Sequence, residues 1–557
     1  MDVSKLPNHH PVAWDTRFEP MALSDMFART TRASPSAPLL HFLGRSYSYS
    51  ELYRDARAFA HSLKARGIAE GDRVGLFLPN VPSYVVGYYG AMMAGAVVVN
   101  FSPLYSVEEL EEQIADSGTR LLVTVDVPEL YATAEEVLRG SDLETLVVSS
   151  LSQMLPKLKG IALRLFARSK VAKVDYRADI LRWDDMLKQG RKVGGELPTI
   201  DPQSLALLQY TGGTTGIPKG AMLTHANLSI NAQQTAGLNP FDDPASEVFM
   251  GALPFFHVFA NTALLNHAVV TGASIAMVPR FETKQVLQTI EKYGATGFPG
   301  VPTMFQALLD HPDLAKTDLS TLRICISGGA PLPGPLREKF EAATGVRLVE
   351  GYGLTESAGV VSANPYEGTR KPGTIGQVLM QTEVLLLNKE DPAIIAPDGE
   401  PGELALHGPQ VMQGYWNRPE AAEEVFVEHH GKTWLRTGDV ATVDEDGFLQ
   451  IVDRIKDMIA VGGFKVFPSQ VEDVLVEHEA IKEALVIGRP DEYRGEVPVA
   501  YVTLEAEGQA TAEELRGWLN ARIGKHERVD EVVIRSDLPK TMIGKLDRKA
   551  LRAEVLH

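Results

Sequence analysis

Residues 210–220 read Tyr-Thr-Gly-Gly-Thr-Thr-Gly-Ile-Pro-Lys-Gly, and this stretch decides how the rest of the chain is interpreted. It follows Ser204-Leu-Ala-Leu-Leu, a short apolar run of the strand type. An amphipathic pattern that is typical of a helix begins at Ala221. We therefore expect a loop that leaves the end of a strand.

The chemistry of this loop suits a polyphosphate. Its glycines let the backbone N–H groups approach an anion closely, and Lys219 adds positive charge. Further hydrogen-bond donors are the hydroxyls of Tyr210, Thr211, Thr214 and Thr215. The loop is not a Walker A loop, because that pattern ends in Gly-Lys-Ser/Thr, whereas here Pro218 precedes the lysine and Gly220 follows it.

The composition is that of an ordinary globular protein. The 557 residues exceed one hydrophobic core and predict two or more domains. The net charge of −18 argues against a nucleic-acid-binding surface, so we expect no nucleic acid partner. The one cysteine, Cys325, lies in an apolar run and leaves no disulfide framework. Because the N-terminus also lacks a signal region, we expect a cytoplasmic protein.

The order of expected strands and helices divides the chain. Strands and helices alternate over residues 72–150 and again from 204 to about 352, which predicts largely parallel sheets. Residues 376–452 indicate a β-rich subdomain, and residues 458–557 a small α+β domain. We expect an α/β fold with a large domain over 1–452, a hinge over 453–457 and a small mobile domain over 458–557.

Residues 151–174 stand out in this acidic chain, because they hold six basic residues and no acid. Apolar residues recur there at steps of four and three: Leu151, Leu155, Leu158, Ala162 and Leu165. This spacing predicts one amphipathic helix with Pro156 in a first turn. One interpretation is a peripheral helix on the inner face of a membrane. The other is a helix that packs on the domain with its basic side chains in water.

The stretch 210–220 resembles the phosphate-binding signature of the adenylate-forming (AMP-binding) superfamily. The resemblance covers nearly the whole chain and is close to the bacterial long-chain fatty acyl-CoA synthetases. Three further segments carry it: Val349-Glu-Gly-Tyr-Gly-Leu-Thr-Glu356, Val361-Ser-Ala-Asn-Pro-Tyr366 and Gly408-Pro-Gln-Val-Met-Gln-Gly-Tyr-Trp416. It implies the acyl-adenylate synthetase fold. It also implies that ATP and Mg²⁺ convert a long-chain fatty acid to acyl-AMP and pyrophosphate, after which coenzyme A takes the acyl group.

The resemblance implies catalytic roles for single residues. Lys545 matches the adenylation lysine that bridges the carboxylate and the α-phosphate. Glu356 matches the Mg²⁺ anchor, since Mg²⁺ takes one or two carboxylates together with phosphate oxygens. Thr215 is the second expected metal contact, and Thr355 the expected phosphate contact. His257 matches a residue beside the acyl site.

The nucleotide contacts implied by the resemblance are spread along the chain. The Tyr352 ring would face adenine, and Asp439 would accept hydrogen bonds from both ribose hydroxyls. Arg454 would contact ribose or phosphate. The full expected set for ATP and AMP is Thr211, Gly212, Gly213, Thr214, Thr215, Gly216, Lys219, Gly329, Ala330, Gly351, Tyr352, Gly353, Asp439 and Arg454.

A two-step reaction gives a reason for a mobile domain, because one site can be rebuilt for each step. Lys456 matches the position about which the small domain turns. Gly462, Gly463 and Lys465 resemble the face that lines the CoA thiol channel. One departure is Asn261, which stands where some relatives carry a gating Trp, so a Trp gate is in doubt here.

Other functions fit parts of the same sequence. An aliphatic chain suits the uncharged regions 255–270 and 297–309, but a medium-chain or aryl acid CoA ligase would share every nucleotide motif. A fatty acyl-AMP ligase would carry an extra insertion, and none is evident. A non-catalytic, membrane-associated protein for acyl or nucleotide uptake would not need Glu356, Asp439, Arg454 and Lys545 together. Acyl chain length and a homodimer are left open.

Overall fold

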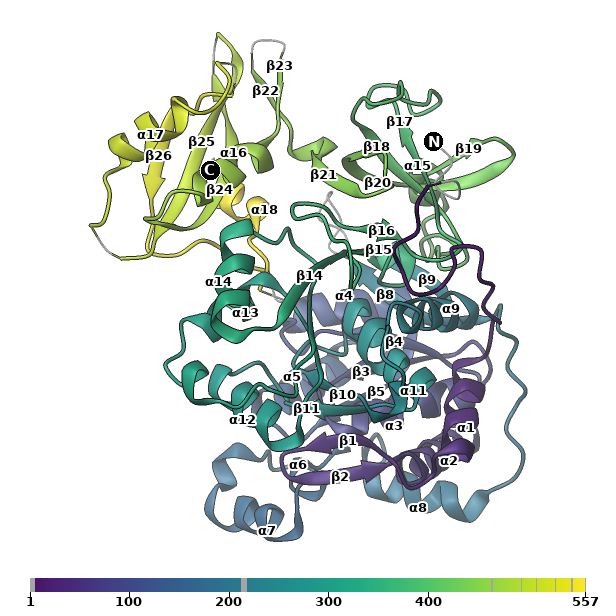
Figure 1. Cartoon of the computed structure of the whole chain (residues 1–557). Helices are drawn as coiled ribbons and strands as arrows, with labels where there is room; N and C mark the ends of the chain where they lie inside the picture. The colour runs from purple at the N-terminus through teal and green to yellow at the C-terminus, as the bar shows by residue number, and fades with distance from the viewer. Residues whose placement is uncertain are drawn as a thin grey trace.

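A large α/β body carries two smaller units built on β-sheets, and the C-terminal unit lies beside one end of the body (Figure 1). The computed structural model describes residues 6–211, 218–461, 464–491, 493–506, 508–525, 527–541 and 544–555, with only the backbone at 464 and 465. The fold is α/β, as the alternation of strands and helices predicts.

The first large sheet has seven strands, and all its neighbouring strands are parallel except the last pair. Their order is β7 (Ile180–Arg182), β6 (Thr145–Ser149), β5 (Thr119–Val125), β3 (Arg73–Phe77), β4 (Val97–Phe101), β8 (Leu205–Thr211) and β9 (Lys219–Thr224). The stretch 210–220 therefore joins β8 to β9 as an antiparallel pair.

The second large sheet has nine strands, with a parallel centre and antiparallel pairs at both edges. Their order is β16 (Gln377–Val378), β15 (Ser362–Ala363), β14 (Arg347–Tyr352), β13 (Ile324–Ser327), β12 (Gly297–Gly300), β10 (Val248–Gly251), β11 (Ser274–Met277), β1 (Pro38–Phe42) and β2 (Arg45–Ser48). In a parallel centre all the carboxyl ends meet at one edge, where open α/β sheets bind ligands.

Two antiparallel-type sheets follow. The first matches the β-rich segment expected over 376–452: β17 (Glu383–Leu387), β18 (Gly402–His407), β19 (Phe426–His429), β20 (Lys432–Val443) and β21 (Leu449–Arg454). The second belongs to the C-terminal unit: β22 (Ile459–Val461), β23 (Phe464–Val466), β24 (Ile481–Asp491), β25 (Gly495–Leu504) and β26 (Glu531–Ile534). Only the pair β25–β26 is parallel there.

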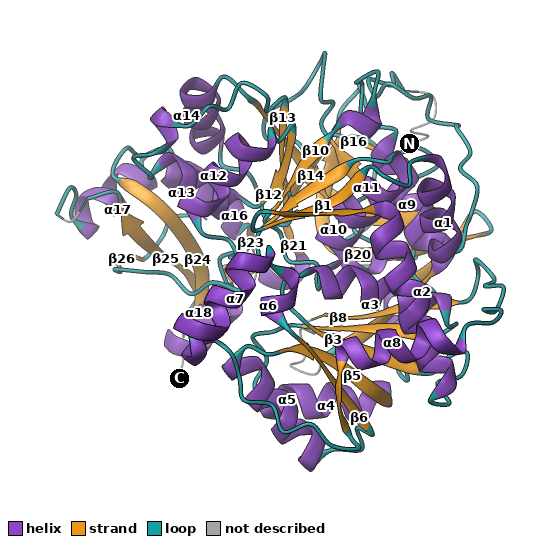
Figure 2. Ribbon diagram, turned by 90° about the horizontal axis from the view of Figure 1, so that it is seen from below, coloured by secondary structure: helices purple, strands orange, loops and turns teal. Residues whose placement is uncertain are grey.

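Helices cover the sheets and fill the space between them (Figure 2). In the large body they are α1 (Leu23–Ala33), α2 (Tyr49–Ala65), α3 (Pro82–Met93), α4 (Val107–Ser117), α5 (Pro128–Gly140), α6 (Leu151–Met154), α7 (Lys157–Phe166), α8 (Trp183–Val193), α9 (His225–Ala236), α10 (Val258–Ala260), α11 (His267–Thr271), α12 (Thr283–Tyr293), α13 (Pro302–Leu309) and α14 (Gly334–Thr344). Later in the chain come α15 (Pro419–Val425), α16 (Pro468–Val476), α17 (Ala512–Asn520) and α18 (Arg548–Val555). Short irregular turns are η2 (Arg168–Lys170), η3 (Pro244–Ser246), η4 (Asn261–Asn266), η5 (Leu314–Lys316), η6 (Thr355–Ser357) and η7 (Ile455–Asp457).

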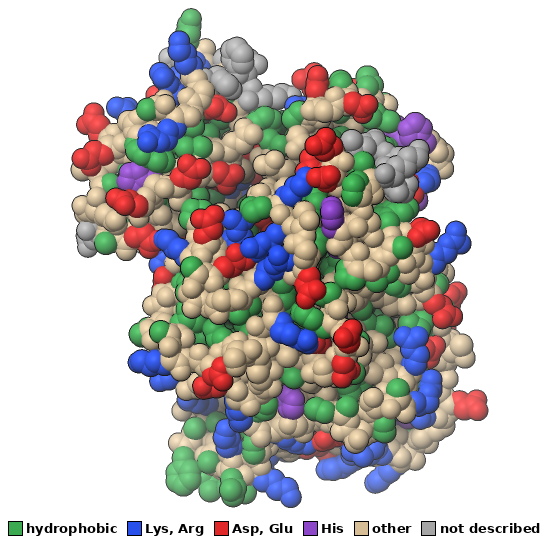
Figure 3. Space-filling model, in the orientation of Figure 1, with side chains coloured by type: hydrophobic (Ala, Val, Ile, Leu, Met, Phe, Trp, Pro, Cys, Tyr) green, Lys and Arg blue, Asp and Glu red, His purple; other side chains and the backbone are tan. Residues whose placement is uncertain are grey.

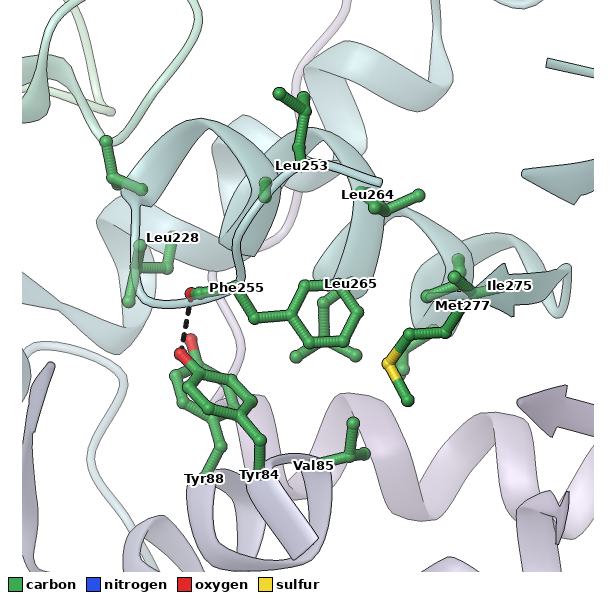
Figure 4. Close-up of a cluster of buried hydrophobic side chains, with 14 of the residues drawn as sticks. Tyr84, Val85, Tyr88, Leu228, Leu253, Phe255, Leu264, Leu265, Ile275 and Met277 are labelled. Carbon is green, nitrogen blue, oxygen red and sulfur yellow. Dashed lines mark hydrogen bonds between the residues drawn. The ribbon is translucent and has the colours of Figure 1, made fainter. Parts of the chain in front are cut away.

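Helix α3 shows why the core needs uncharged helices. It lies between the two large sheets, and every one of its residues is buried. Its Tyr84 and Val85 point toward Phe255, Leu265 and Met277, which come from the side of the nine-stranded sheet (Figure 4). A helix that is enclosed on all sides has no solvent face for charged residues.

The helix expected from Ala221 begins later. Residues 219–224 instead form β9, because they pair with β8 along its length. Thr224 then caps α9, and Asn227 completes the capping box. The amphipathic interpretation was also wrong, since α9 is buried on nearly all sides.

The basic segment is not one helix. The chain is extended at Leu155, and α7 begins after Pro156, because a residue that precedes proline disfavours the helical conformation. The break separates the expected stripe: Leu151 and Leu155 pack against the core, whereas Leu158 is 83% exposed. Within the described residues, every helix is too short or too polar to span a bilayer.

Candidate active site

One cavity of about 540 Å³ extends along the carboxyl ends of the nine-stranded sheet and the faces of the two smaller units. The expected site residues that line it are Thr211, Lys219, His257, Gly329, Gly351, Tyr352, Gly353, Thr355, Glu356, Arg454, Lys456 and Lys545. Residues from three sheets and from a turn of the C-terminal unit thus meet, although up to 334 positions separate them in the sequence (211 to 545).

Some expected residues do not line the cavity or cannot be placed. Ala330 is absent from the lining, and Asp439 is buried behind it. Several expected residues lie outside the described residues: Gly212, Gly213, Thr214, Thr215, Gly216, Gly462 and Gly463. The side chain of Lys465 is likewise outside the described part of the chain. Tyr210 does not serve as a donor of the loop, because it does not line the cavity. Its hydroxyl instead donates to the Asp116 carboxylate at 2.6 Å.

Lys545 enters the cavity from the C-terminal unit. A turn holds it, in which the Thr541 N–H donates to the Lys545 carbonyl at 2.7 Å. Its side chain lies against Gly329, where an added Cβ would come within 2.8 Å of Cε and 3.1 Å of Nζ. Gly329 also has a φ of +80°, which favours glycine, so a larger residue there would be strained and would displace the end of the Lys545 side chain. Burial, and then the neighbouring Arg454, lower the pKa of the Lys545 ammonium to about 8.

Asp439 is held by two partners that line the cavity. The Tyr352 hydroxyl donates to one carboxylate oxygen, and the Arg454 Nε donates to the other at 2.9 Å. Asp439 is paired with Arg454 across neighbouring strands, β20 and β21. Burial first, then Asp439, raises the pKa of the Tyr352 phenol well above its ordinary value, so this hydroxyl stays a donor. The three side chains form a rigid polar wall.

Glu356 lines the cavity from η6. The Tyr415 hydroxyl donates to its Oε1 at 2.8 Å, and among the described residues no partner is found for Oε2. A carboxylate with one oxygen held and one available suits Mg²⁺, which takes few carboxylates and several phosphate oxygens. Lys219 lies near, with Nζ 5.4 Å from the centre of the Tyr415 ring. Outside the masked ranges, no group of three or more metal-type side chains is found anywhere.

Among the described residues, five basic side chains line this cavity: Lys219, Arg436, Arg454, Lys456 and Lys545. Burial lowers the pKa of both Lys456 and Lys545, and Arg454 lowers each further. A lowered lysine pKa means that the protonated form is destabilised in the folded protein, because its lost hydration is not replaced by enough nearby negative charge. An anion that binds here would supply that charge, as a triphosphate does.

His257 marks the boundary between the polar and apolar parts of the cavity. Its Nδ1 accepts a hydrogen bond from the Phe259 N–H at 3.3 Å, so the ring nitrogen that carries hydrogen is Nε2. Burial, and then the charge of Lys545, lower the pKa of this imidazole to about 3. His257 is therefore neutral near pH 7 and can position a substrate carboxylate but not neutralise it.

Beyond His257 the lining becomes apolar. Part of it comes from the expected regions 255–270 and 297–309: Val258, Phe259, Ala263, His267 and Pro299. Further lining comes from segments that the sequence analysis did not assign to the acyl chain: Thr235, Leu238, Phe249, Ile324, Ile326, Val360, Ala363 and Tyr366. No single motif holds these residues, because they meet only when the strands and α9 are packed.

Asn261 has another role than a gate. It is fully buried, does not line the cavity, and starts the π-helical turn η4. The Tyr88 hydroxyl donates to its Oδ1 at 2.7 Å, and its amide donates to the Tyr84 hydroxyl at 3.3 Å. The side chain therefore joins η4 to α3 at the back of the acyl wall.

The sequence interpretation missed two polar pairs of the nucleotide end. Tyr415, which holds Glu356, lies inside the segment 408–416 that carries the family resemblance. Arg436 donates to Glu403 at 2.8 Å, and both line the cavity. Arg436 lies three residues before Asp439 in the sequence. This closeness to an expected nucleotide contact was the signal that could have identified it.

Comparisons with known proteins agree with this site. The AMP-binding enzyme family matches residues 27–416, and the AMP-binding enzyme C-terminal domain matches residues 470–545. A long-chain-fatty-acid–CoA ligase of Bacillus subtilis (strain 168) is 39% identical over 93% of this chain and 92% of its own length. One of Escherichia coli O6:H1 is 35% identical over 98% of this chain and 97% of its own.

A solved structure is also similar. The ATP-bound crystal structure of MatB from Rhodopseudomonas palustris superposes with a TM-score of 0.83 at 27% identity. The superposition covers 95% of this chain and 98% of that one. The match includes the C-terminal unit that brings Lys545 to the cavity. The chain therefore belongs to the AMP-binding enzyme family, and by sequence it groups with the long-chain-fatty-acid–CoA ligases of that family.

Proposed function

We propose that this protein is a long-chain fatty acid–CoA ligase that forms AMP. It activates the fatty acid with ATP to acyl-AMP and pyrophosphate, and then transfers the acyl group to coenzyme A. The observation that carries the proposal is one continuous cavity, with five cations of the described residues toward one end and an apolar wall toward the other. Lys545 and His257 also line this cavity.

The first half-reaction joins two anions, and the residues present meet that demand. Lys545 would neutralise the fatty acid carboxylate and the α-phosphate as they approach, which is a contact made strongest in the transition state. Thr355, Lys219 and Arg454 would hold phosphates and ribose. Glu356 would hold Mg²⁺, with Thr215 as a second contact, and the ion would supply charge to the leaving pyrophosphate.

The second half-reaction needs a different arrangement of the same site. We propose a large domain over 1–452, a hinge over 453–457 and a small domain over 458–557 that turns about Lys456. Asp453 supports the hinge position, because its carboxylate accepts a hydrogen bond from the Ser469 N–H at the start of α16. After the turn, Gly462, Gly463 and Lys465 would line the path of the CoA thiol.

The test is pyrophosphate release with Mg-ATP and a panel of acids: acetate, octanoate, palmitate, oleate and 4-coumarate, each with and without CoA. We expect CoA-dependent turnover that is greatest with the long chains. The Lys545→Ala variant should lose at least about a hundredfold in rate, the usual cost of a transition-state contact. Best turnover with 4-coumarate would favour an aryl acid ligase, and acyl-AMP that accumulates despite CoA would favour an acyl-AMP ligase.

We also propose that the protein works at the inner face of the membrane and contacts it through α7. Four of its side chains support this, since they are large, apolar and more than half exposed: Leu158 (83%), Ile161 (54%), Leu165 (55%) and Phe166 (87%). They account for the apolar patch at the foot of the molecule (Figure 3). The same segment, 151–174, holds six basic residues and no acid, and such a combination suits an anionic lipid surface.

The helix is held with its apolar face outward. The Lys159 Nζ donates to the Leu43 carbonyl at 3.0 Å, and the Arg164 Nε donates to the Ser152 hydroxyl at 2.7 Å. Sedimentation with vesicles of neutral or anionic phospholipid tests the contact. Binding should require anionic lipid and be lost in the double variant Leu158→Ser, Phe166→Ser. Tyr493→Ser, which changes an exposed side chain elsewhere, is the control; equal binding by both variants would contradict the proposal.

A further inference from the structure

The apolar part of the cavity runs along the strands of the nine-stranded sheet to their far ends. His257 follows β10, and Glu247 precedes it, yet both line the cavity. Gly328 follows β13, and Ile324 at its start also lines the cavity. Four-residue strands at about 3.3 Å per residue make this path roughly 13 Å long. The cavity thus reaches the opposite edge of the sheet from the nucleotide site.

The far end is polar, although the wall that leads to it is apolar. Thr235, Glu247 and His267 line the cavity there. His267 is only 4% exposed, and the edge of its ring packs against Phe249 with 4.9 Å between the ring centres. A polar group at the closed end of a lipid pocket is costly unless it meets a partner.

The hydrogen-bond pattern identifies which atom of His267 needs a partner. The Thr235 hydroxyl donates its one proton to the Ala232 carbonyl at 2.8 Å. It can therefore only accept from the His267 Nδ1, which lies 3.2 Å away, so the ring carries its proton on Nδ1. The His267 Nε2 is then a lone-pair acceptor, and it is buried with no partner among the described residues. Burial also lowers the pKa of this imidazole to about 4, which keeps it neutral.

The neighbouring charges do not fill this role. Glu247 is ion-paired with Arg323 and also accepts a hydrogen bond from the Thr296 hydroxyl. The Arg323 guanidinium is stacked 3.8 Å from the centre of the Phe241 ring. Arg323 thus balances the charge of Glu247, although Glu247 Oε1 accepts no hydrogen bond among the described residues. Of the two buried acceptors at this end, His267 Nε2 is the one that lacks an ion-pair partner as well as a hydrogen bond.

We propose that the acyl cavity takes fatty acids that carry a hydroxyl group at or near the end of the chain, and that this hydroxyl donates to His267 Nε2. The inference rests on the proposed ligase function and names its substrate class more closely. A site built to bind a hydroxyl rejects the analogue without it, because its own buried polar atom is then left unpaired. A plain chain would leave Nε2 without a donor.

The test compares kcat/KM for palmitate and ω-hydroxypalmitate, and extends to shorter and longer ω-hydroxy acids. The wild-type protein should prefer the hydroxy acid by about tenfold or more at one chain length, because the hydroxyl meets the fixed His267 Nε2 only at that length. His267→Leu should abolish that preference, so that the ratio of kcat/KM for the two acids falls to about one. His267→Gln, which keeps an acceptor oxygen, should retain part of it.

The matched control is Phe249→Leu, an apolar change beside His267 that should alter both acids alike. The inference would be overturned if the ratio of kcat/KM for the hydroxy acid to that for the plain acid were the same in wild type and His267→Leu. It would also be overturned if the wild-type protein rejected the hydroxy acid at every chain length. Calorimetric binding of both acids to the same variants gives the ratio without turnover. If neither acid is activated, the ligase function fails, and the calorimetric ratio still decides this inference.

Discussion

Gly329 is the residue at which the fold leaves room for catalysis. An added Cβ would press on the Lys545 side chain and would also have to adopt a φ of +80°. We expect Gly329→Ala to slow acyl-adenylate formation at least tenfold, because a displaced charge loses its transition-state contact. Gly345→Ala is the control, since Gly345 has a similar φ of +70° but open space around it. Stopped-flow measurement of acyl-AMP should separate them; equal slowing would mean that backbone strain alone is responsible.

The lowered pKa of Lys545 predicts a pH dependence. A lysine with a pKa of about 8 loses its proton as the pH rises through that value, and the contact with two anions is lost with the charge. We therefore expect kcat/KM for adenylation to fall above about pH 8. Because an arginine side chain keeps its charge throughout this pH range, the residual kcat/KM of Lys545→Arg should not fall above pH 8. A wild-type profile that stays flat to pH 10 would contradict the prediction.

Single residues also show what the sequence could reveal of the site. Lys545, Glu356 and Arg454 lie in segments with a recognisable order, so their meeting in one cavity could be predicted from resemblance. Their roles stay predictions until the variants are tested. Thr235 and His267 could not be found in this way, since their importance depends on which hydroxyl proton goes to which acceptor.

At the scale of the element, η4 stabilises the wall between the acyl cavity and the core. The Tyr88 hydroxyl is buried and donates to Asn261, so Asn261→Leu leaves it without an acceptor. We expect the free energy of unfolding to fall by about 1–3 kcal/mol. Tyr88→Phe in the same chain removes the orphaned hydroxyl, and the double variant should recover part of that loss. Denaturant titration measures all three; strictly additive losses would show that the two groups are not coupled.

The elements divide into those that local pattern determines and those that it does not. The alternation of strands and helices predicts β3 to β6 together with α3 and α4 closely, because each pattern is continuous and has clear ends. Two predictions failed where a distant partner or a single residue decided the outcome. Pairing with β8 makes 219–224 a strand, and Pro156 divides the basic segment.

At the scale of the whole molecule, weak contacts hold the C-terminal unit where Lys545 reaches the cavity. The Lys482 Nζ donates to Asp310 at 2.9 Å, and Lys339 lies 3.5 Å from Glu505. Both pairs join the unit to the large body near α13 and α14. Partly exposed pairs of this kind contribute about 0.2–1 kcal/mol each, so they bias an arrangement without locking it. Such a balance suits the movement of this unit that we propose between the two half-reactions.

This balance gives a prediction about the two half-reactions. Asp310→Lys places two like charges together, so it should disfavour the present arrangement by up to about fivefold, the equivalent of 1 kcal/mol. Single-turnover acyl-AMP formation should slow accordingly, whereas transfer from preformed acyl-AMP to CoA should not. Lys482→Asp in the same chain reverses the pair and should restore the first rate. Arg489→Gln is the control, because Arg489 pairs with Asp530 and Glu531 inside the C-terminal unit. If Asp310→Lys slowed both half-reactions equally, the pair would serve stability and not the position of the unit.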